Sequence, residues 1–390
     1  MFLVESELNS KYDAIVIGGG LTGCVVARRL AEELGYRVLI LEKRNHIGGN
    51  LYDYFDDNGI LIQKYGPHIF HTNSDEIFHF VSKYCDWKDY NLRCMVHMCG
   101  KNTPSPFNFK TIDDFYTEKE STIIKNEIEK EFEHRDCATI IEMLSSKNPI
   151  IKKYADFLFE HDYSLYTAKQ WGVLPSEIDI SVLNRVPIRF SYEDGYFSDK
   201  YQILPIGGFS FFIGRLIDHE KIDVVLSSDF TDKLIVDSLN NKVIYDNETI
   251  LIPVIYTGEL DRLLNYRFGC LPYRSLHFEN ITLEVDTYQP APVVAYPEDE
   301  RVTRIVEYKQ LPIQTTSGVT TLVKEYPVNY EENNEPYYPI PTNYSLSQYN
   351  LYKAAVKEIS NLYVCGRLGD YKYYNMDQAI ERSFEIFNKI

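Results

Sequence analysis

The chain of 390 residues lacks the marks of a membrane or secreted protein. No apolar run approaches the roughly 20 residues that a bilayer-spanning helix needs. The 7 cysteines are odd in number and scattered, so they form no disulfide framework, and we expect a reducing compartment. The segment MFLVESELNS at the start holds glutamates but no basic residue, so we expect no signal peptide. These absences predict a cytoplasmic protein without a membrane span.

Basic residues and tryptophan are also in short supply. Lys plus Arg number 40 against 57 Asp plus Glu, which gives a net charge of −17. A surface of this sign does not bind nucleic acid or anionic lipid as a whole, so we expect neither as a partner, although it leaves room for a local basic pocket. Only 2 tryptophans occur, whereas tyrosine is abundant at 32 residues. Because tyrosine joins an apolar face to a polar tip, this surplus indicates either a polar ligand cavity or wet cores.

Metal ligands are scarce as well. Cys94, His97 and Cys99 lie close together in the sequence. No second cluster completes the four-ligand set of a structural zinc site. We therefore expect no bound metal.

The N-terminal segment predicts a βαβ unit. Residues 13–17 (DAIVI) form a short apolar run typical of a buried strand. Apolar residues then recur at helical spacing over 21–34, and Gly35 follows as a stop signal. Residues 37–41 (RVLIL) predict a second strand that leads into Glu42.

The turn between the first strand and the helix, residues 18–23 (GGGLTG), matches the G-x-G-x-x-G fingerprint of dinucleotide-binding proteins. In that fingerprint Gly18 permits the tight turn, Gly20 lets a pyrophosphate approach the backbone, and Gly23 lets the helix pack closely on the strand. The helix N-terminus offers free N–H groups to the phosphates. Glu42 is placed to accept hydrogen bonds from the adenosine ribose.

Two further segments favour FAD over NAD as the dinucleotide. Residues 42–50 (EKRNHIGGN) continue directly from the ribose position, and their paired glycines let a loop lie along a long ligand. Residues 364–367 (VCGR) predict a strand end with a glycine turn, and 375–377 (NMD) predict a cap for a last helix from Gln378. A helix N-terminus there would stabilise negative charge on a flavin ring.

The rest of the chain predicts two other kinds of structure. Apolar residues at helical spacing between about 112 and 170 predict a small helical insertion. Alternating residues at 302–309 and 320–326 predict half-buried strands of an antiparallel sheet. An amphipathic segment at 211–217 and a strand ending at 254–256 return to the first sheet. We therefore predict an α/β fold with a discontinuous Rossmann-like FAD-binding domain, a helical insertion and an antiparallel β-sheet domain.

With these elements in place, the chain resembles the prokaryotic UDP-galactopyranose mutases, from Tyr12 to the C-terminal helix. The resemblance rests on segments that follow one another in the family's order: EKRNHIGGN (42–50), YGPHIFHT (65–72), YTAKQWG (166–172), RVPIRF (185–190), YFSDKYQ (196–202), YRFG (266–269), EPYYP (335–339) and GRLGDYKYYNMD (366–377).

The resemblance implies an isomerase (an intramolecular transferase) that interconverts UDP-galactopyranose and UDP-galactofuranose for cell-surface glycan synthesis. It implies reduced FAD as cofactor, although the reaction has no net redox change. In the family's mechanism, flavin N5 attacks the anomeric carbon, UDP leaves, and the sugar opens and recloses through another hydroxyl before UDP returns. Such covalent catalysis divides one difficult step into easier ones. The resemblance also implies a homodimer.

The resemblance also implies roles for individual residues of this sequence. It implies that Arg189, on a mobile loop of about 182–194, and Arg304 bind the diphosphate, which a guanidinium can grip in bidentate fashion. His71 would approach the flavin ring and set its conformation. The expected catalytic residues are thus Arg189, Arg304 and His71. The expected substrate-binding residues are Tyr166, Thr167, Trp171, Tyr201, Tyr337, Tyr338 and Tyr373. By the resemblance, Trp171 contacts the sugar, and Tyr166 and Thr167 lie near the uracil and the sugar or phosphate. The other four tyrosines would hydrogen-bond the diphosphate, since tyrosine donates to phosphate without adding charge.

The expected cofactor-binding residues are Gly18, Gly20, Leu21, Thr22, Gly23, Glu42, Lys43, Arg44, Gly49, Asn50, His68, Ile69, Gly366, Arg367, Asn375 and Met376. The expected domain ranges are 11–92, 206–265 and 355–390 for the FAD-binding domain, 109–176 for the helical domain, and 93–108, 177–205 and 266–354 for the sheet domain. The substrate cleft should lie where the three domains meet.

Some residues depart from the family pattern. Ala168 replaces an acidic residue that many members carry, Pro67 replaces alanine, and Asn375 replaces an aspartate of some members. These departures leave the sugar open among UDP-galactose, UDP-N-acetylgalactosamine and dTDP-fucose. An amine-oxidase-like FAD oxidoreductase and a non-catalytic nucleotide-binding protein are the other readings of the sequence.

Overall fold

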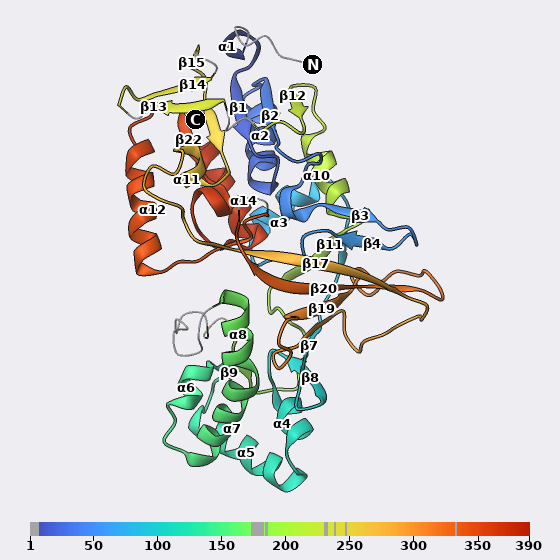
Figure 1. The fold of residues 1–390 in the computed structure, drawn as a ribbon. Helices are drawn as coiled ribbons and strands as arrows, with labels where there is room; N and C mark the ends of the chain where they lie inside the picture. The colour runs from blue at the N-terminus through green and yellow to red at the C-terminus, as the bar shows by residue number, and fades with distance from the viewer. Residues whose placement is uncertain are drawn as a thin grey trace.

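Three groups of elements lie along the length of the molecule: a parallel sheet with its helices at one end, a large sheet in the middle and a helical group at the other end (Figure 1). The computed structural model describes residues 8–172, 183, 186–229, 233–237, 239–245, 248–331 and 334–390. None of the helices in these ranges combines the length and apolarity that crossing a bilayer requires.

The parallel sheet is built from strands that lie far apart in the sequence. Its strands stand side by side in the order β12 (Ile222–Val225), β2 (Val38–Leu41), β1 (Ala14–Ile17), β16 (Val254–Tyr256) and β22 (Leu362–Val364). Every neighbouring pair in it is parallel. The central strands are short apolar runs buried on both faces, as expected where both faces are covered.

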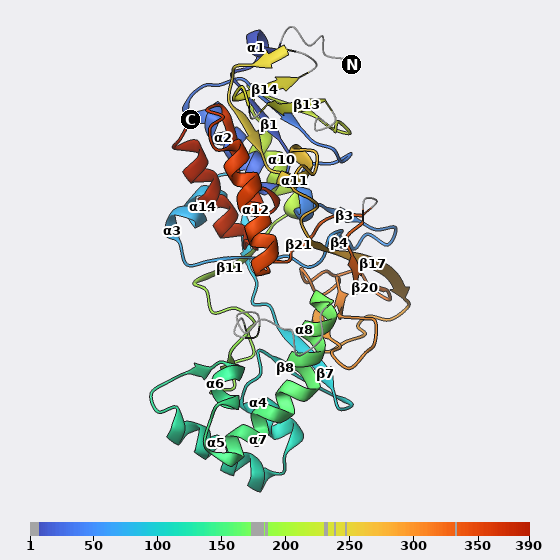
Figure 2. The same cartoon turned by 60° about the vertical axis from the view of Figure 1, so that its left-hand side comes forward.

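Helices and a small sheet cover the two faces of the parallel sheet. On one face, α2 (Leu21–Glu33) packs against the sheet and against α14 (Met376–Phe387), which lies beside it (Figure 2). On the other face lie elements from the middle and the end of the chain: β13 (Leu234–Asp237), β14 (Lys242–Tyr245), β15 (Glu248–Ile250), α11 (Leu260–Leu263) and α12 (Asn343–Val356).

The middle of the molecule is a seven-stranded sheet. Its order is β21 (Tyr338–Pro339), β17 (Tyr273–Leu283), β20 (Thr320–Asn329), β19 (Arg304–Glu307), β18 (Val293–Ala295), β7 (Cys94–Met98) and β8 (Lys101–Ser105). All its pairs are antiparallel except β18 with β7, so the sheet is mixed where the sequence predicted an antiparallel one. The exception arises where the β7–β8 hairpin, from the first quarter of the chain, joins strands from its last third.

The helical group has its own core at the far end of the molecule. Its elements are α4 (Phe109–Phe115), α5 (Glu118–Glu131), α6 (Ile140–Leu144), α7 (Pro149–Leu158), the π-helix η3 (Phe159–Tyr163) and α8 (Ser164–Trp171). The short strands β9 (Cys137–Ala138) and β10 (Ile188–Arg189) pair within it. The long segments α7, η3 and α8 follow one another without a break and reach back to the middle sheet.

Shorter elements connect these groups. They are α1 (Leu8–Lys11), the 3₁₀-helix η2 (Gly49–Leu51), β3 (Asp53–Phe55), β4 (Leu61–Gln63), β5 (Phe70–Thr72), α3 (Asp75–Ser82), β6 (Trp87–Asp89), β11 (Tyr201–Pro205), α10 (Phe209–Ile217) and α13 (Gly366–Gly369). The carboxylate of Asp53 accepts hydrogen bonds from the N–H groups of Phe209 and Ser210, at 2.6 and 2.8 Å. This contact fixes the start of α10 against β3.

Replacing Gly23 with alanine should destabilise the protein, because the new Cβ would lie 2.1 Å from the carbonyl oxygen of Gly18. The obstacle is backbone and cannot rotate away, so we expect a loss of about 1–3 kcal/mol in the free energy of unfolding. Gly214→Ala in α10 is the control, since no atom lies within 4 Å of its added Cβ. That variant should gain about 0.5–1 kcal/mol. Denaturant unfolding measures both, and equal stability of the two variants would contradict the packing argument.

Candidate functional site

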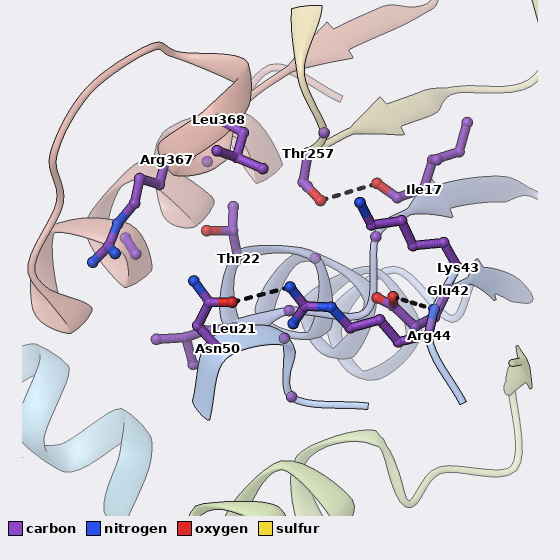
Figure 3. Close-up of a pocket in the computed structure, with 18 of the residues that line it drawn as sticks. Ile17, Leu21, Thr22, Glu42, Lys43, Arg44, Asn50, Thr257, Arg367 and Leu368 are labelled. Atoms are coloured by element: carbon purple, nitrogen blue, oxygen red, sulfur yellow. Dashed lines mark hydrogen bonds between the residues drawn. The ribbon is translucent and has the colours of Figure 1, made fainter. Parts of the chain in front are cut away.

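The N-terminus of α2 opens into a pocket at the carboxyl edge of the parallel sheet (Figure 3). Gly18 turns the chain with a φ of 109°, a conformation that favours glycine. The N-cap of α2 is Gly20, which has no side chain to occupy the first N–H groups of the helix. These groups lack intrahelical partners and face the pocket with the positive end of the helix dipole. The pocket therefore has an anion-binding end.

Glu42, at the end of β2, forms the next part of the pocket wall. Its side chain is buried, and its carboxylate oxygens accept hydrogen bonds from the N–H groups of Gly19 and Arg44, at 2.7 and 2.8 Å. Each oxygen retains a second lone pair for a ligand hydroxyl. The fingerprint turn and the acidic residue thus hold each other in place.

Basic side chains that follow Glu42 are tied to an acidic residue from the other end of the chain. The guanidinium of Arg44 donates to both carboxylate oxygens of Glu335, at 2.9 and 3.3 Å, and to Oδ1 of Asn50 at 3.1 Å. Lys43 Nζ lies 3.4 Å from the same carboxylate and 3.9 Å from Glu259. These pairs compensate the positive charges in the pocket and orient them before a ligand enters.

The opposite end of the pocket is formed by α13 and the N-terminus of α14. Gly366 begins α13 with a φ of 86°, and Arg367 donates a hydrogen bond to the carbonyl of Tyr374 at 2.7 Å. The helix α14 begins at Met376 with Asn375 as its N-cap, two residues before the start that the sequence predicted at Gln378. A second helix N-terminus therefore faces the pocket, as Asn375 and Met376 line it.

The pocket brings together nearly all the residues predicted to bind a cofactor: Gly18, Gly20, Leu21, Thr22, Gly23, Glu42, Lys43, Arg44, Gly49, Asn50, His68, Gly366, Arg367, Asn375 and Met376. Ile69 does not line it, because its side chain is buried in the adjoining core. The contacts of all these residues with a cofactor stay predictions.

The pocket also contains residues that sequence reasoning missed, among them Thr257, Gly258, Glu259, Arg262 and Glu335. The first three follow β16, which pairs with β1. The carboxyl end of that predicted strand was therefore a signal, because the ends of parallel strands meet at one edge of a sheet. Glu335 carried no such signal, since its partner Arg44 lies 291 positions earlier.

His68 lies where the pocket meets the middle sheet. Burial, together with the charges of Arg367 and Arg304, lowers the pKa of His68 to about 3. The imidazole is therefore neutral at physiological pH. Its Nδ1 lies 2.8 Å from the carbonyl oxygen of Gly66, so Nδ1 carries the proton and Nε2 is an acceptor.

Arg304 is held by a buried carboxylate directly opposite on the neighbouring strand. Its Nε and Nη2 lie 2.9 and 2.8 Å from Oε2 of Glu325, whose side chain is only 1% exposed. Glu325 also accepts a hydrogen bond from Thr303 Oγ1 at 3.4 Å. Within the described part of the chain, Nη1 of Arg304 has no hydrogen-bond partner. Glu325 thus holds the guanidinium of Arg304 in one orientation and compensates its positive charge.

Predicted substrate-binding tyrosines gather around this pair. The pKa of the Tyr166 hydroxyl is raised, because burial outweighs the opposing effect of the Arg304 charge. Tyr166 therefore lies within electrostatic reach of Arg304. Burial likewise raises the pKa of Tyr338, whose ring stacks on that of Tyr373 at 5.4 Å. Arg367 lies over the Tyr373 ring at 4.8 Å, so this tyrosine cluster adjoins the pocket. The hydroxyls of Tyr166 and Tyr338 therefore stay protonated and can donate.

The structure describes two of the remaining predicted substrate residues, Tyr337 and Thr167, with their side chains. Tyr337 is buried and meets Phe278 edge to face at 5.8 Å beside Tyr338, and Thr167 is buried on α8. The side chain of Trp171 lies outside the described residues. So do positions 182, 184 and 185 of the predicted mobile loop.

Arg189, His71 and Tyr201 are not brought to the pocket. The guanidinium of Arg189 donates to the carbonyl oxygens of Gly195 and Tyr196, the second at 3.0 Å. His71 Nδ1 lies 2.9 Å from Asp199. These three side chains therefore already have partners within the fold.

Tyr201 in particular lies apart from the tyrosine cluster. Its hydroxyl donates to Asp75 at 2.7 Å and its ring stacks on Phe78 at 3.9 Å. Tyr196, by contrast, acts electrostatically on Tyr166 and so lies near the cluster. Tyr196 therefore lies nearer to the tyrosine cluster than Tyr201 does, and a substrate contact of Tyr201 stays a prediction.

Comparisons with known proteins show which family the chain belongs to. A sequence profile described as UDP-galactopyranose mutase matches residues 159–373, and one for an NAD(P)-binding Rossmann-like domain matches 16–84. The UDP-galactopyranose mutase of Mycoplasma genitalium is 35% identical over 382 residues, covering 96% of this chain and 93% of its own. The chain belongs to the UDP-galactopyranose mutase family. The α/β fold with a Rossmann-like domain and the isomerase class predicted from the sequence are thereby confirmed.

Other similar proteins show how far this similarity extends in sequence and in fold. The dTDP-fucopyranose mutase of Escherichia coli is 34% identical over 373 residues, covering 95% of this chain and 96% of its own. A crystal structure of reduced UDP-galactopyranose mutase superposes over 97% of this chain and 93% of its own with a TM-score of 0.71 at 18% identity. Putrescine oxidase, with a TM-score of 0.57 at 11% identity, shares only the fold. The family is a sugar-nucleotide mutase family, and its members differ in sugar and base.

Removing the hydroxyl of Tyr338 should impair sugar-nucleotide turnover more than removing that of Tyr201. A hydrogen bond to a charged group contributes about 1.5–3 kcal/mol, so Tyr338→Phe should lower kcat/KM about tenfold or more. Tyr201→Phe should stay within about twofold of the unmodified enzyme, because its hydroxyl is engaged with Asp75. Steady-state kinetics measures both. An equal loss in the two variants would contradict the position assigned to Tyr201.

Proposed function

We propose that the protein binds FAD, and that with reduced FAD it interconverts UDP-galactopyranose and UDP-galactofuranose. The observation that carries this proposal is the position of His68: it lines the dinucleotide pocket, and the charges of Arg367, which also lines the pocket, and of Arg304, beside the tyrosine cluster, both lower its pKa. A dinucleotide in the pocket would thus end beside a site suited to a second, anionic ligand.

The pocket residues fit FAD in particular. The N-terminus of α2 suits a pyrophosphate, and Glu42 retains acceptor capacity for a ribose. The pocket then extends to the N-terminus of α14 and to the neutral His68, which gives room and polar partners for a ring system beyond the pyrophosphate. Reduced FAD bound there would supply the nucleophile for displacement of the nucleoside diphosphate from the sugar.

The chain's own contribution is to bind and orient the diphosphate. Arg304 offers its free Nη1 donor, held in place by Glu325, where negative charge develops as the diphosphate departs. The hydroxyls of Tyr166, Tyr338 and Tyr373 would share the phosphate contacts. A diphosphate role for Arg189 requires it to exchange the carbonyl groups of Gly195 and Tyr196 for the ligand.

A second candidate differs only in the substrate. The dTDP-fucopyranose mutase of Escherichia coli matches this chain as well as the UDP-galactopyranose mutases do. We place UDP-galactose first, and UDP-N-acetylgalactosamine and dTDP-fucose after it. The proposal also includes a homodimer, a cytoplasmic location and supply of the furanose for cell-surface glycans, all by analogy with the family.

Reduced enzyme should convert UDP-galactofuranose to UDP-galactopyranose, and oxidised enzyme should not. The measurement compares UDP-galactose, UDP-N-acetylgalactosamine and dTDP-fucose as substrates for dithionite-reduced protein, with chromatographic separation of the products. Turnover that requires oxidised flavin and O₂ would overturn the mutase proposal in favour of an oxidase. The highest kcat/KM in the panel identifies the substrate.

Arg304→Ala should abolish measurable turnover while FAD stays bound. One lost charge-assisted contact to a developing phosphate charge lowers kcat at least about 100-fold. The same loss is expected for Arg189→Ala if that residue binds the diphosphate. Flavin absorbance after gel filtration checks cofactor content. A variant that keeps near wild-type kcat rules out the diphosphate role of its arginine.

A further inference from the structure

A cluster of three potential metal ligands lies outside the predicted active site, where the helical group meets the middle sheet. Cys99 lies in the turn between β7 and β8, His161 lies in the π-helix η3, and Glu298 lies in the loop after β18. Their ligand atoms all lie within 4.8 Å of one another. These side chains come from three separate elements, so the fold itself brings them together.

The spacing of the three ligand atoms is close to that around a tetrahedral zinc ion. Cys99 Sγ lies 3.4 Å from His161 Nδ1 and 3.6 Å from Glu298 Oε1, and the last two atoms lie 2.8 Å apart. Zinc bonds of about 2.3 Å to sulfur and about 2.0–2.1 Å to nitrogen and oxygen give edges of about 3.6, 3.6 and 3.3 Å. Two edges already match, and the third needs to open by about half an ångström.

The backbone of two of the elements is unusual at this point. Cys99 has a φ of 49° and is followed by Gly100 with a φ of 73°, a turn in which Asn, Asp or Gly usually takes the place of Cys99. His161 lies in a π-helix, whose extra residue turns its side chain relative to the α-helices on either side. The backbone of Cys99 also donates to Glu298 Oε2 at 2.8 Å, which fixes the carboxylate beside the thiol.

We propose that Cys99, His161 and Glu298 bind a zinc ion, with water as the fourth ligand. A thiolate and an imidazole select a zinc-like ion over Mg²⁺ or Ca²⁺, which prefer oxygen ligands. Binding releases the thiol proton of Cys99 and the proton that His161 Nδ1 shares with Glu298 to solvent, and forms one bond from each freed atom to the metal. Cys99 is exposed and the other two side chains are about one-third exposed, so the ion can enter from solvent.

The other cysteine and the histidine of this hairpin do not take part. Cys94 is buried in the core on β7, and His97 Nδ1 lies 2.9 Å from Asn102 Oδ1. Cys94, His97 and Cys99, which lie close together in the sequence, therefore do not gather into one site. Cys99 instead meets a histidine 62 positions away.

A zinc ion here would join α7, η3 and α8 to the middle sheet. Lys169, on α8, already donates to the carbonyl oxygens of Tyr296 and Val302, at 2.7 and 2.8 Å, in the same loop region as Glu298. Tyr166 and Thr167 lie on that helix. The ion would thus be a structural crosslink at the base of a helix that carries predicted substrate residues.

Zinc binding to the full-length holoenzyme tests the proposal. Protein treated with a chelator, then dialysed against zinc chloride and washed, should retain about one zinc per chain by mass spectrometry of the metal. Cys99→Ser and Glu298→Gln should each weaken binding at least about 100-fold in competition with a chromophoric chelator, because loss of even an outer-shell partner costs about 10–100-fold. Cys270→Ser, which removes an exposed cysteine elsewhere, is the matched control and should bind as the unmodified protein does.

Cobalt(II) gives a second readout that distinguishes this site from adventitious thiols. Tetrahedral coordination with one thiolate gives intense visible bands at longer wavelength than flavin absorbance, and these should vanish in Cys99→Ser and persist in Cys270→Ser. Unfolding curves in chelator should coincide for all variants, whereas zinc should raise Tm only where the site is intact. Zinc affinity that is equal in Cys99→Ser and in the unmodified protein, or the absence of tight binding, would show that His161 and Glu298 form an ion pair only.

Discussion

The packing of Gly23 on the carbonyl of Gly18 is the constraint on which the rest of the site depends. It lets α2 lie against β1 closely enough for its first turn to face the carboxyl edge of the parallel sheet. The helix α14 then packs on α2, and this brings the second helix N-terminus to the other end of the pocket. A bulkier residue at either glycine would displace both helix ends together.

An acidic protein accommodates anionic ligands here by pairing its basic groups in advance. Arg44 and Lys43 share Glu335, and Arg304 is bound to Glu325. Each pair fixes a guanidinium or ammonium group in place and reduces the repulsion between the cations. The N–H donors of these basic groups that the pairs do not use therefore have fixed orientations. A net charge of −17 is thus compatible with a local site for phosphate groups.

The sequence predicts this fold well where one segment contains both partners of a contact. The βαβ unit, the helical spacing of α2 and the loop of residues 42–50 are local features, and the structure has them where they were expected. Contacts between distant segments left no such pattern, as for Arg44 with Glu335. Tyr196 and Tyr201 lie five positions apart, and the sequence does not show which of the two lies near Tyr166. The meeting of Cys99 with His161 and Glu298 depends on a π-helix, which helical periodicity does not show.

The parallel sheet also constrains how the chain can be made. Its first strand and helix lie near the N-terminus, but the edge strand β22 and the covering helix α14 come from the last thirty residues or so, roughly 350 positions later. A ribosome must therefore finish almost the whole chain before α2 gains its partner. Until then, the apolar face of α2 and one edge of the sheet stay exposed, and a nascent chain in this state is a natural client for chaperones.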